Sequence, residues 1–486
     1  LSGGLAVEDF NRDGLLDIFV TSWGLADQAK LLIADGTGAY VDRTSAAGLD
    51  GITGGLNVTH ADYDNDGFDD IFIMRGAWLG EGGAHPNSLL HNRGDGTFED
   101  VTFAAGLYSL HPTPTAAWAD FNLDGRLDLF VGNESGIAQG GGSHPSELFV
   151  NNGDGTFREV SRAVGIDLDA FVKGSSWGDV NNDGLPDLYV SVLNGANRLY
   201  INRGGASLAT WRFEEQAVVA GVDQPRWSFP TWFWDVDQDG WDDILVLAYD
   251  LSNTGALHDA VAREYVTPRL AIGPPSGVGA SRLYRNERHG TFSDITRAAG
   301  LGDKVIFAMG SNFGDLDNDG WLDFYVGTGN PDLRSVIPNR MFHSVGGRRF
   351  EEVTLEGGFG QIQKGHAIAF VDLDRDGDAD VYEVIGGAYQ GDRFANVLFE
   401  NPGWPDHAWI GLELEGRTAN RSAIGARVRV EVIDASGQPR TIHRTVGTGG
   451  SFGAGSLALL VGVGTAQRIE RVDVTWPDAA RSTSTH

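Results

Sequence analysis

Short apolar runs recur along most of the chain, and each follows a strongly acidic segment. The runs are rich in β-branched and aromatic side chains and are too short for helices, so they predict strands. Seven runs share this setting: Ile18–Val20, Ile71–Ile73, Leu129–Val131, Leu188–Val190, Ile244–Val246, Phe324–Val326 and Val381–Tyr382. The hydrophobic pattern is therefore that of a repeat protein built from strands.

A second signature follows each apolar run further along the chain. It is clearest at 92–102 and 151–161, where an Asn-x-Gly-Asp-Gly-Thr-Phe turn separates two alternating segments, and weaker versions lie at 34–44, 202–216, 286–296 and 342–354. Each unit then has four short strands. Seven such units predict an all-β fold, a seven-bladed β-propeller over residues 1–403, because radial repetition leaves few exposed sheet edges. The fifth unit carries an insertion at about 249–279.

The acidic segments themselves share the pattern Asp-x-[Asp/Asn]-x-Asp-Gly-x-x-Asp, which we call the Asp loops. They begin at Asp9, Asp62, Asp120, Asp179, Asp235, Asp315 and Asp372. Oxygen-bearing side chains at positions 1, 3, 5 and 9, with a glycine turn at position 6, suit a hard cation such as Ca²⁺, which takes 6–8 oxygen ligands. Seven independent EF-hands are excluded, because strand-forming residues flank the loops where EF-hands need helices.

The loops predict up to seven structural Ca²⁺ ions. The predicted side-chain ligands are Asp9, Asn11, Asp13 and Asp17; Asp62, Asp64, Asp66 and Asp70; Asp120, Asn122, Asp124 and Asp128; Asp179, Asn181, Asp183 and Asp187; Asp235, Asp237, Asp239 and Asp243; Asp315, Asp317, Asp319 and Asp323; Asp372, Asp374, Asp376 and Asp380. The predicted carbonyl ligands are Leu15, Phe68, Arg126, Leu185, Trp241, Trp321 and Asp378. The alternative is an acidic turn without metal, held by Asx-type hydrogen bonds.

Composition and charge narrow the classes of partner. The chain has 67 Asp and Glu against 36 Lys and Arg, a formal charge of −31, so a nucleic-acid partner is not expected. It has no cysteine, hence no disulfide and no thiolate metal site. No apolar run is long enough for a membrane span. Calcium-dependent loops favour a secreted or periplasmic setting.

From Trp404 onward the Asp loops stop and strict alternation takes over. The alternating stretches are 409–415, 426–433 and 471–476, and a Gly/Ser-rich connection lies at Gly447–Gly455. These features predict a second, smaller β-rich and sandwich-like domain at 404–486, which we call the tail module. It is too short for two further blades.

Both parts resemble a known family. The Asp loops resemble the FG-GAP/VCBS repeats of integrin-α-type propellers. The tail module is similar to the ASPIC/UnbV module that follows such repeats in bacterial secreted proteins and in cartilage acidic protein, through 420–428, 449–452, 461–464 and 472–477. The resemblance implies calcium ligation at the loops and an extracellular role, often in recognition. It does not fix an activity.

Function is expected on the face opposite the Asp loops, where the connections between the second and third strands differ most from unit to unit. His85 and His144 each precede a proline in such connections, and they are the catalytic candidates, with His60, His111 and His366 expected nearby. These histidines could form a second metal site or an acid/base centre. The alternative is that His-Pro only shapes two related loops.

The candidate ligand-binding residues on the same face are Trp78, Trp227, Trp232, Lys173 and His366. The aromatic ones could stack on a sugar or another planar ligand, and the alternative is packing between blades. Two classes of function remain. One is a binding module for an extracellular carbohydrate, protein or small molecule; the other is a lyase, isomerase or hydrolase. A deep pocket with converging His85 and His144 favours the enzyme, and an aromatic-rimmed face favours binding.

Overall fold

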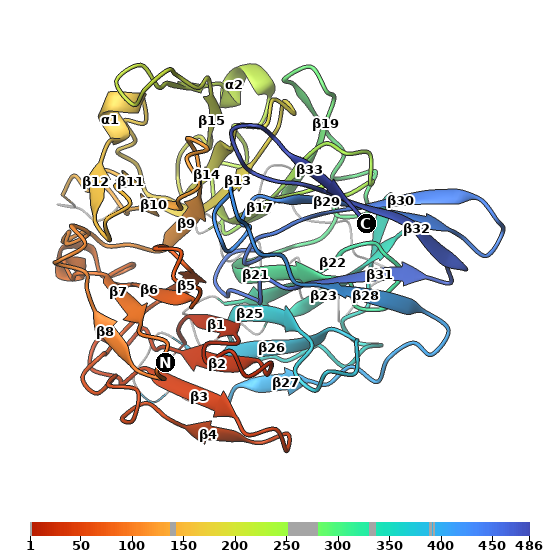
Figure 1. The fold of residues 1–486 in the computed structure, drawn as a ribbon, viewed down its shortest axis with the longest axis horizontal. Coiled ribbons are helices and arrows are strands. Elements are labelled where there is room, and N and C mark those ends of the chain that lie inside the picture. Colours follow the sequence, from red (N-terminus) through yellow and green to blue (C-terminus); the bar gives the residue numbers. More distant parts are fainter. Residues whose placement is uncertain (1, 137–141, 251–279, 330–336, 388–390, 392–393) are drawn as a thin grey trace.

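The computed structural model describes residues 2–136, 142–250, 280–329, 337–387, 391 and 394–486. Within them the chain forms repeated antiparallel sheets of consecutive strands arranged around a common centre (Figure 1). This arrangement confirms the all-β propeller class that the hydrophobic pattern predicts. Most of the predicted insertion at 249–279 lies outside the described residues.

Seven of the sheets follow one plan, with strands in chain order from the centre outward. Six of them have the predicted four strands, and the seventh has three among the described residues. The first strands are β1 (Leu5–Glu8), β5 (Asn57–Ala61), β9 (Thr115–Ala119), β13 (Val172–Gly178), β17 (Ser228–Trp234), β21 (Ala308–Gly314) and β25 (Gly365–Val371). The second strands are β2 (Asp17–Val20), β6 (Asp70–Met74), β10 (Asp128–Gly132), β14 (Asp187–Val192), β18 (Asp243–Ala248), β22 (Asp323–Thr328) and β26 (Asp380–Ile385).

The outer strands carry the Asn-Gly turns. The third strands are β3 (Lys30–Ala34), β7 (Ser88–Asn92), β11 (Glu147–Asn151), β15 (Arg198–Asn202), β19 (Arg282–Asn286), β23 (Arg340–Val345) and β27 (Val397–Phe399). The fourth strands are β4 (Tyr40–Asp42), β8 (Phe98–Asp100), β12 (Phe157–Glu159), β16 (Phe213–Glu215), β20 (Phe292–Asp294) and β24 (Arg349–Glu352). Among the described residues, three single turns of helix lie in the connections: η1 (Gly80–Gly83), α1 (Ser161–Val164) and α2 (Ala217–Ala220).

The Asp loops join the first strand to the second in every one of these sheets. In the second sheet, for example, Ala61 pairs with Asp70 and Asn57 with Met74, so the loop between them closes one end of the strand pair. The connections from second to third strand therefore leave at the opposite end. This places the Asp loops on one face of the ring and the variable connections on the other.

Apolar side chains between neighbouring sheets form the core. Phe72 and Leu89 of the second sheet, for example, cluster with Trp118 and Leu129 of the third. The first and seventh sheets meet in the same way, through a cluster that contains Leu5, Val7, Ala367, Ala369 and Val371. The ring is thus closed by packing of the first sheet on the seventh.

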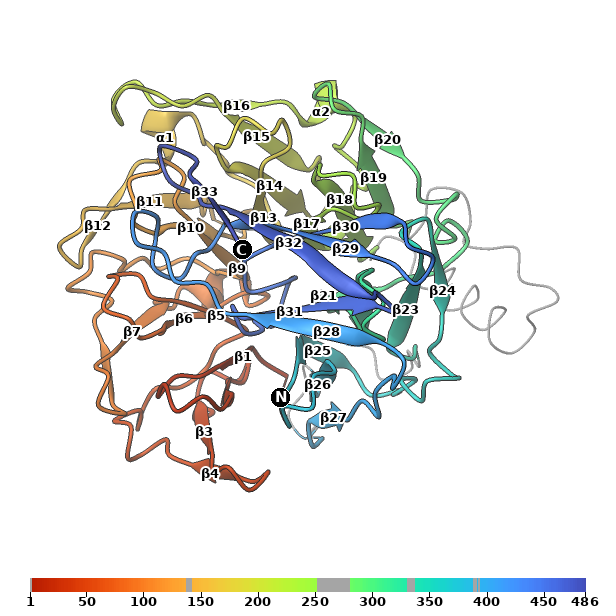
Figure 2. The ribbon, with the colours of Figure 1, turned by 45° about the vertical axis from the view of Figure 1, so that its right-hand side comes forward.

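The tail module forms two further sheets that lie across one face of the ring (Figures 1 and 2). One pairs β28 (Ala408–Leu412) with β31 (Leu459–Gly464); the other has the order β30 (Pro439–Thr445), β29 (Arg427–Ile433), β32 (Arg468–Thr475) and β33 (Thr483–Thr485). Side chains of β29 alternate between buried and half-buried, as the sequence alternation requires. Their buried side has its own apolar core, which includes Val428, Val430 and Val472.

The Gly/Ser-rich segment 447–455 does more than connect two strands of the tail module. It enters the ring and forms backbone hydrogen bonds with three of the first strands: Ser451 exchanges two with Ser311, Phe452 accepts one from Ile368, and Ala454 exchanges two with Leu5 and Val7. The side chain of Phe452 is 1% exposed. We call residues 447–455 the plug.

Candidate metal loops and candidate ligand pocket

Each Asp loop is held by its own carboxylates. In the second loop, Asp62 accepts hydrogen bonds from the backbone N–H groups of Asp66 (2.9 Å) and Gly67 (2.8 Å), and Asp66 accepts one from Phe68 (2.9 Å). Gly67 has a φ of 103°, which a residue with a Cβ adopts only under strain. The glycine at position 6 thus curls the loop so that its carboxylates point inward.

The ninth residue of the loop is buried at the start of the second strand. Asp70 accepts hydrogen bonds from Asn92 N–H (2.8 Å) and Tyr63 N–H (3.2 Å). Burial raises the pKa of Asp70 to about 8 and that of Asp62 to about 7. Carboxylates in this state are costly to ionise together unless a cation lies among them.

The residues present fit a hard divalent cation. Carboxylate oxygens of Asp62, Asp64 and Asp66 lie within 4.8 Å of one another, as do those of Asp235, Asp237 and Asp239. Buried oxygens of Asp17 and Asp237 have no hydrogen-bond partner in the described part of the chain. An oxygen-only donor set of this kind is what Ca²⁺ prefers. The identity of the ions and the carbonyl ligands stay predictions.

Two histidines beside the loops were missed by sequence reasoning. His91 Nδ1 lies 3.1 Å from Asp70 Oδ1, and His343 Nδ1 lies 3.0 Å from Asp323 Oδ1. These hydrogen bonds raise the pKa of both histidines to about 9. The corresponding position of the third strand is Val150 in the third sheet, so only an alignment of the units with one another would have revealed the two histidines.

The tail module covers the Asp-loop face. Arg427 Nη2 donates to the carbonyl of Gly240 (2.9 Å), and Arg440 Nη1 donates to that of Asp319 (2.6 Å). Arg444 pairs with Asp315 at 3.3 Å, and both side chains are buried. Guanidinium groups of the tail module therefore meet the acidic loops directly.

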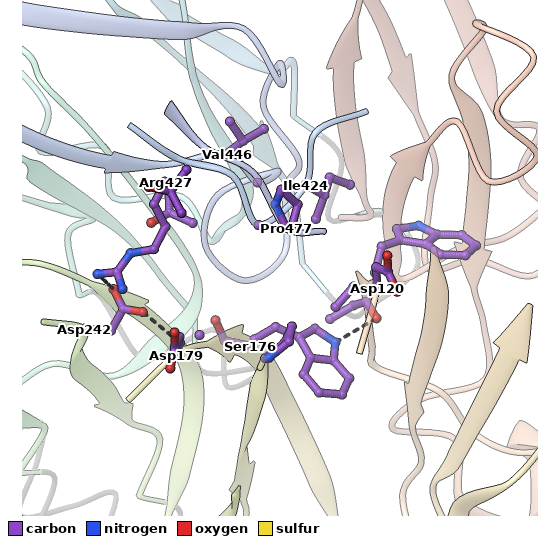
Figure 3. A pocket seen from close by; sticks show the side chains of 18 of the residues that line it. Asp120, Ser176, Asp179, Asp242, Ile424, Arg427, Val446 and Pro477 are labelled. Carbon is purple, nitrogen blue, oxygen red and sulfur yellow. Dashed lines mark hydrogen bonds and ion pairs between the residues drawn. The ribbon is translucent and has the colours of Figure 1, made fainter. Parts of the chain in front are cut away.

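A cavity of about 400 Å³ remains between the tail module and the third and fourth sheets (Figure 3). Asp120, Ser176 and Asp179 line it from the ring, and Ile424 and Pro477 from the tail module. Asp120 and Asp179 are the first residues of two Asp loops. The polar side of the cavity is therefore part of the predicted metal-binding face.

A separate pocket of about 320 Å³ lies on the opposite face, at the inner ends of the first strands. Its walls are mostly apolar and aromatic: Trp23, Leu56, Trp78, Tyr249 and Met309 line it, together with His366, Lys364, Ser2 and glycines of two connections. The plug packs against one of these lining residues, because the Phe452 ring lies 4.8 Å from the His366 ring, and it also lies 5.0 Å from the Phe229 ring. We call this the axial pocket.

Two residues that line the axial pocket each have a buried ring nitrogen without a partner among the described residues. His366 Nδ1 lies 3.2 Å from the carbonyl of Gly3 and must carry the proton there, and burial lowers the pKa of His366 to about 4. Its Nε2 is therefore an acceptor, and neither it nor the Trp78 Nε1–H donor has a hydrogen-bond partner among the described residues. Aromatic lining residues that also carry an unsatisfied acceptor and an unsatisfied donor suit a ligand with both an apolar face and polar edges.

Lys173 lies behind Trp78 rather than in the pocket. Its ammonium lies 3.2 Å from the centroid of the Trp78 ring and pairs with Glu134, which also accepts a hydrogen bond from Trp78 N–H (2.7 Å). Burial lowers the pKa of Lys173 to about 8. Trp78 itself has a φ of 67°, a left-handed conformation that is strained for a bulky residue. Lys173 and Glu134 thus hold Trp78 in place.

The remaining candidates are placed differently from our expectation. Trp232 is 1% exposed and packs on Phe313 and Phe324 between two sheets, so the packing alternative fits it. Trp227 packs against the apolar cluster around Phe229 without lining the pocket. His60 lies near the Asp-loop end of β5, away from the variable connections.

The two catalytic candidates do not form a pair. His144 Nδ1 lies 2.9 Å from His111 Nδ1, whereas the His85 ring makes no hydrogen bond within the described residues. Burial lowers the pKa of both His111 and His144. Neither His85 nor His144 lines the axial pocket. The convergence that would have favoured an enzyme is therefore not seen in the described part of the chain.

The sheets, the Asp loops and the tail module together define a class, the β-propeller repeat proteins with an appended β module. A model of the FG-GAP-like repeat matches residues 9–73, 77–131, 137–190, 179–246 and 270–326, and a model described as ASPIC and UnbV matches residues 416–486. The chain belongs to the FG-GAP-like repeat family and carries a C-terminal ASPIC and UnbV module.

Curated relatives agree with this assignment. Cartilage acidic protein 1 of Homo sapiens is 31% identical over 170 residues, which cover 33% of this chain and 23% of the human protein. The Mus musculus protein is 24% identical over 504 residues, covering 98% of this chain and 71% of its own length. The match to the Xenopus tropicalis protein spans 16% of that protein. The alignments with the human and frog proteins thus span less than a quarter of their lengths.

Solved structures show weaker likeness. BBS1N in complex with ARL6DN has a TM-score of 0.43 at 10% identity, covering 79% of this chain and 89% of its own. The fungal Aleuria aurantia lectin, a six-bladed β-propeller with a fucose recognition mode, has a TM-score of 0.36 at 10% identity. The match covers 72% of this chain and 94% of the lectin chain. Within the described residues, no helix is long and apolar enough to cross a membrane.

Proposed function

We propose that this chain is a calcium-stabilised, extracytoplasmic binding protein that holds its ligand in the axial pocket. The observation that carries the proposal is that two residues lining this aromatic pocket, Trp78 and His366, each have a buried ring nitrogen without a partner in the described chain. A buried donor and acceptor without partners cost free energy in the empty protein, and a ligand that satisfies both recovers it. The ligand class that fits is a saccharide or another small molecule with one flat apolar face.

Calcium has a structural part in this proposal. Each Asp loop fastens a first strand to a second strand on the face that the tail module covers, away from the axial pocket. Loops repeated in each sheet are what a scaffold needs, whereas a catalytic metal is commonly single and keeps an open position. The kinship with cartilage acidic protein 1 supports an extracytoplasmic setting.

Binding can be tested by screening the calcium-loaded chain against a glycan array and a library of aromatic fragments, with tryptophan fluorescence as the readout. Trp78→Phe keeps the aromatic face and removes the Nε1–H donor, and His366→Leu removes the acceptor. Each should weaken the strongest hit by about tenfold, the value of a hydrogen bond to a buried partner.

Trp404→Phe is the matched control, because Trp404 is 42% exposed in the segment before β28 and far from the pocket in the fold. It should leave the affinity unchanged. Hits that bind equally well to both pocket variants would overturn the assignment of the site.

A further inference from the structure

Three side chains that belong to no predicted calcium site meet between the first and second sheets. Glu8 is the last residue of β1, His60 is the penultimate residue of β5, and Asp69 is the eighth residue of the second Asp loop. A nitrogen of His60 and carboxylate oxygens of Glu8 and Asp69 all lie within 4.8 Å of one another. They lie beneath Gly455 and Leu457 of the tail module.

In its neutral form, His60 presents a free lone pair to this cluster. Its Nε2 lies 3.0 Å from the carbonyl oxygen of Gly455, so Nε2 carries the proton and Nδ1 is the unprotonated nitrogen of the neutral ring. Nδ1 faces Asp69 Oδ1 at 3.7 Å, which is too long for a hydrogen bond. Neither atom has a hydrogen-bond partner in the described part of the chain, although His60 is fully buried at 0% exposure.

Glu8 is held in place by the tail module. One carboxylate oxygen accepts hydrogen bonds from Asp9 N–H (2.9 Å) and Ser456 Oγ (3.1 Å), and the other accepts one from Leu457 N–H (2.8 Å). These bonds fix the carboxylate beside His60 and leave one lone pair free, on the oxygen that accepts from Leu457 N–H. The cluster therefore has an ordered carboxylate, a buried imidazole nitrogen and a second carboxylate with an unused oxygen.

We propose that Glu8, His60 and Asp69 bind a divalent metal of the Zn²⁺ class. An imidazole nitrogen with two carboxylates suits zinc and its neighbours in the first transition series, whereas calcium takes oxygen ligands. Two ligand atoms at about 2.0–2.2 Å from one ion lie roughly 3–4 Å apart, which matches the separation of His60 Nδ1 and Asp69 Oδ1. The site is distinct from the Asp loops in donor chemistry and ligand set.

Such an ion would fasten the tail module to the ring. The Nε2–H of a metal-bound histidine is commonly held by a carbonyl or carboxylate, and here the carbonyl of Gly455 in the plug takes that place. Glu8 contributes a second link through Ser456 and Leu457. The competing occupant is a proton: burial lowers the pKa of His60, but Asp69 and Glu8 outweigh burial and raise it overall.

The test uses the full chain, stripped with a chelator and then saturated with calcium so that the Asp loops are filled. Zn²⁺ is titrated by calorimetry, and Co²⁺ serves as a spectroscopic probe whose visible bands report nitrogen and oxygen ligation. We expect one Zn²⁺ to bind in the presence of excess Ca²⁺. Asp69→Asn and His60→Gln should each weaken Zn²⁺ binding by more than about tenfold and alter the Co²⁺ bands.

His91→Gln is the matched control, because His91 lies beside Asp64 and Asp70 in a separate cluster near the same loop. It should leave Zn²⁺ binding unchanged. Asp69 is 17% exposed, so Asp69→Asn remains informative if the change at the buried His60 prevents folding. No Zn²⁺ uptake by the calcium-saturated chain, or uptake that Asp69→Asn leaves intact, would overturn the proposal and leave an imidazolium between two carboxylates.

Discussion

The two faces of the ring differ in what their polar groups do. On the Asp-loop face, carboxylates are numerous, and arginines of the tail module such as Arg444 pair with them. On the opposite face, the axial pocket has few polar groups, and two of them, Trp78 Nε1 and His366 Nε2, have no partner in the described chain. The comparison teaches that the most numerous polar groups, the Asp-loop carboxylates, interact mainly with the protein itself. The few polar groups without partners mark the axial pocket as the better candidate for a ligand site.

Removal of divalent ions should give the largest effect on this comparison. If the Asp loops hold calcium, each filled site contributes about 2.7 kcal/mol at a hundredfold excess over Kd. EDTA should then lower Tm by more than about 10 °C in differential scanning calorimetry. Calcium should restore Tm, and an unchanged Tm after chelation would contradict metal binding at the loops.

Truncation of the Phe452 side chain in the plug should give the next largest effect, because the plug connects the two faces. Phe452→Ala removes a buried ring that contacts both Phe229 and His366, and it should cost about 3–5 kcal/mol of unfolding free energy. Urea denaturation measures the loss. Phe103→Ala, at a ring that is 82% exposed, is the control and should change stability by less than about 1 kcal/mol.

The sequence predicted the sheets and the Asp loops because both depend on local patterns. Short apolar runs and Gly-Asp-Gly turns settle strand pairing within one unit, and the loop hydrogen bonds of Asp62 and Asp66 span only a few residues. The seven-sheet arrangement then follows from repetition.

The plug and the axial pocket could not be predicted in this way. Phe452 meets Phe229, and Lys173 meets Trp78, across long stretches of chain, and no local pattern encodes such contacts. The sequence placed two tryptophans on the expected ligand face without distinguishing them: Trp78 lines the pocket, and Trp232 is core. Which aromatic residues face a ligand depends on the packing of sheets from different units.

Loss of the buried ion pair between the tail module and the sixth Asp loop tests whether arginines of the tail module offset the negative charge of the Asp-loop face. Arg444→Leu leaves Asp315 buried without its guanidinium, so we expect a loss of about 3 kcal/mol in calcium-free protein. Added calcium should narrow the deficit. Arg468→Leu, also in the tail module, breaks an exposed pair with Glu470 and should cost less than about 1 kcal/mol. Equal losses for both variants would show that burial of the pair is unimportant.

The smallest expected effect is on the pH dependence of stability, through His366 on the opposite face. Its pKa is about 4 in the folded protein because of burial, against about 6.5 when unfolded. Between these pH values the unfolded chain therefore binds more protons than the folded chain. The contribution of His366 to the free energy of unfolding is complete above about pH 6.5 and is lost as the pH falls toward 4.

The pH-dependent contribution of His366 to the free energy of unfolding is at most roughly 3 kcal/mol. His366→Leu should flatten the stability profile in this window, as measured by urea denaturation at a series of pH values. His443→Leu, at another histidine whose pKa burial lowers to about 4, reports how much of the profile belongs to the tail module instead. A His366→Leu profile identical to that of the parent chain would contradict a neutral, acceptor state of Nε2.

The different roles of the two faces are tested most directly by one measurement: the affinity of the strongest screening hit for three calcium-saturated proteins. These are the parent chain, Asp66→Asn in the second Asp loop, at a position that is Asp in all seven loops, and His366→Leu in the axial pocket. The account predicts that Asp66→Asn lowers Tm yet leaves affinity unchanged, whereas His366→Leu weakens binding by about tenfold. Loss of binding in folded Asp66→Asn together with full binding in His366→Leu would contradict it.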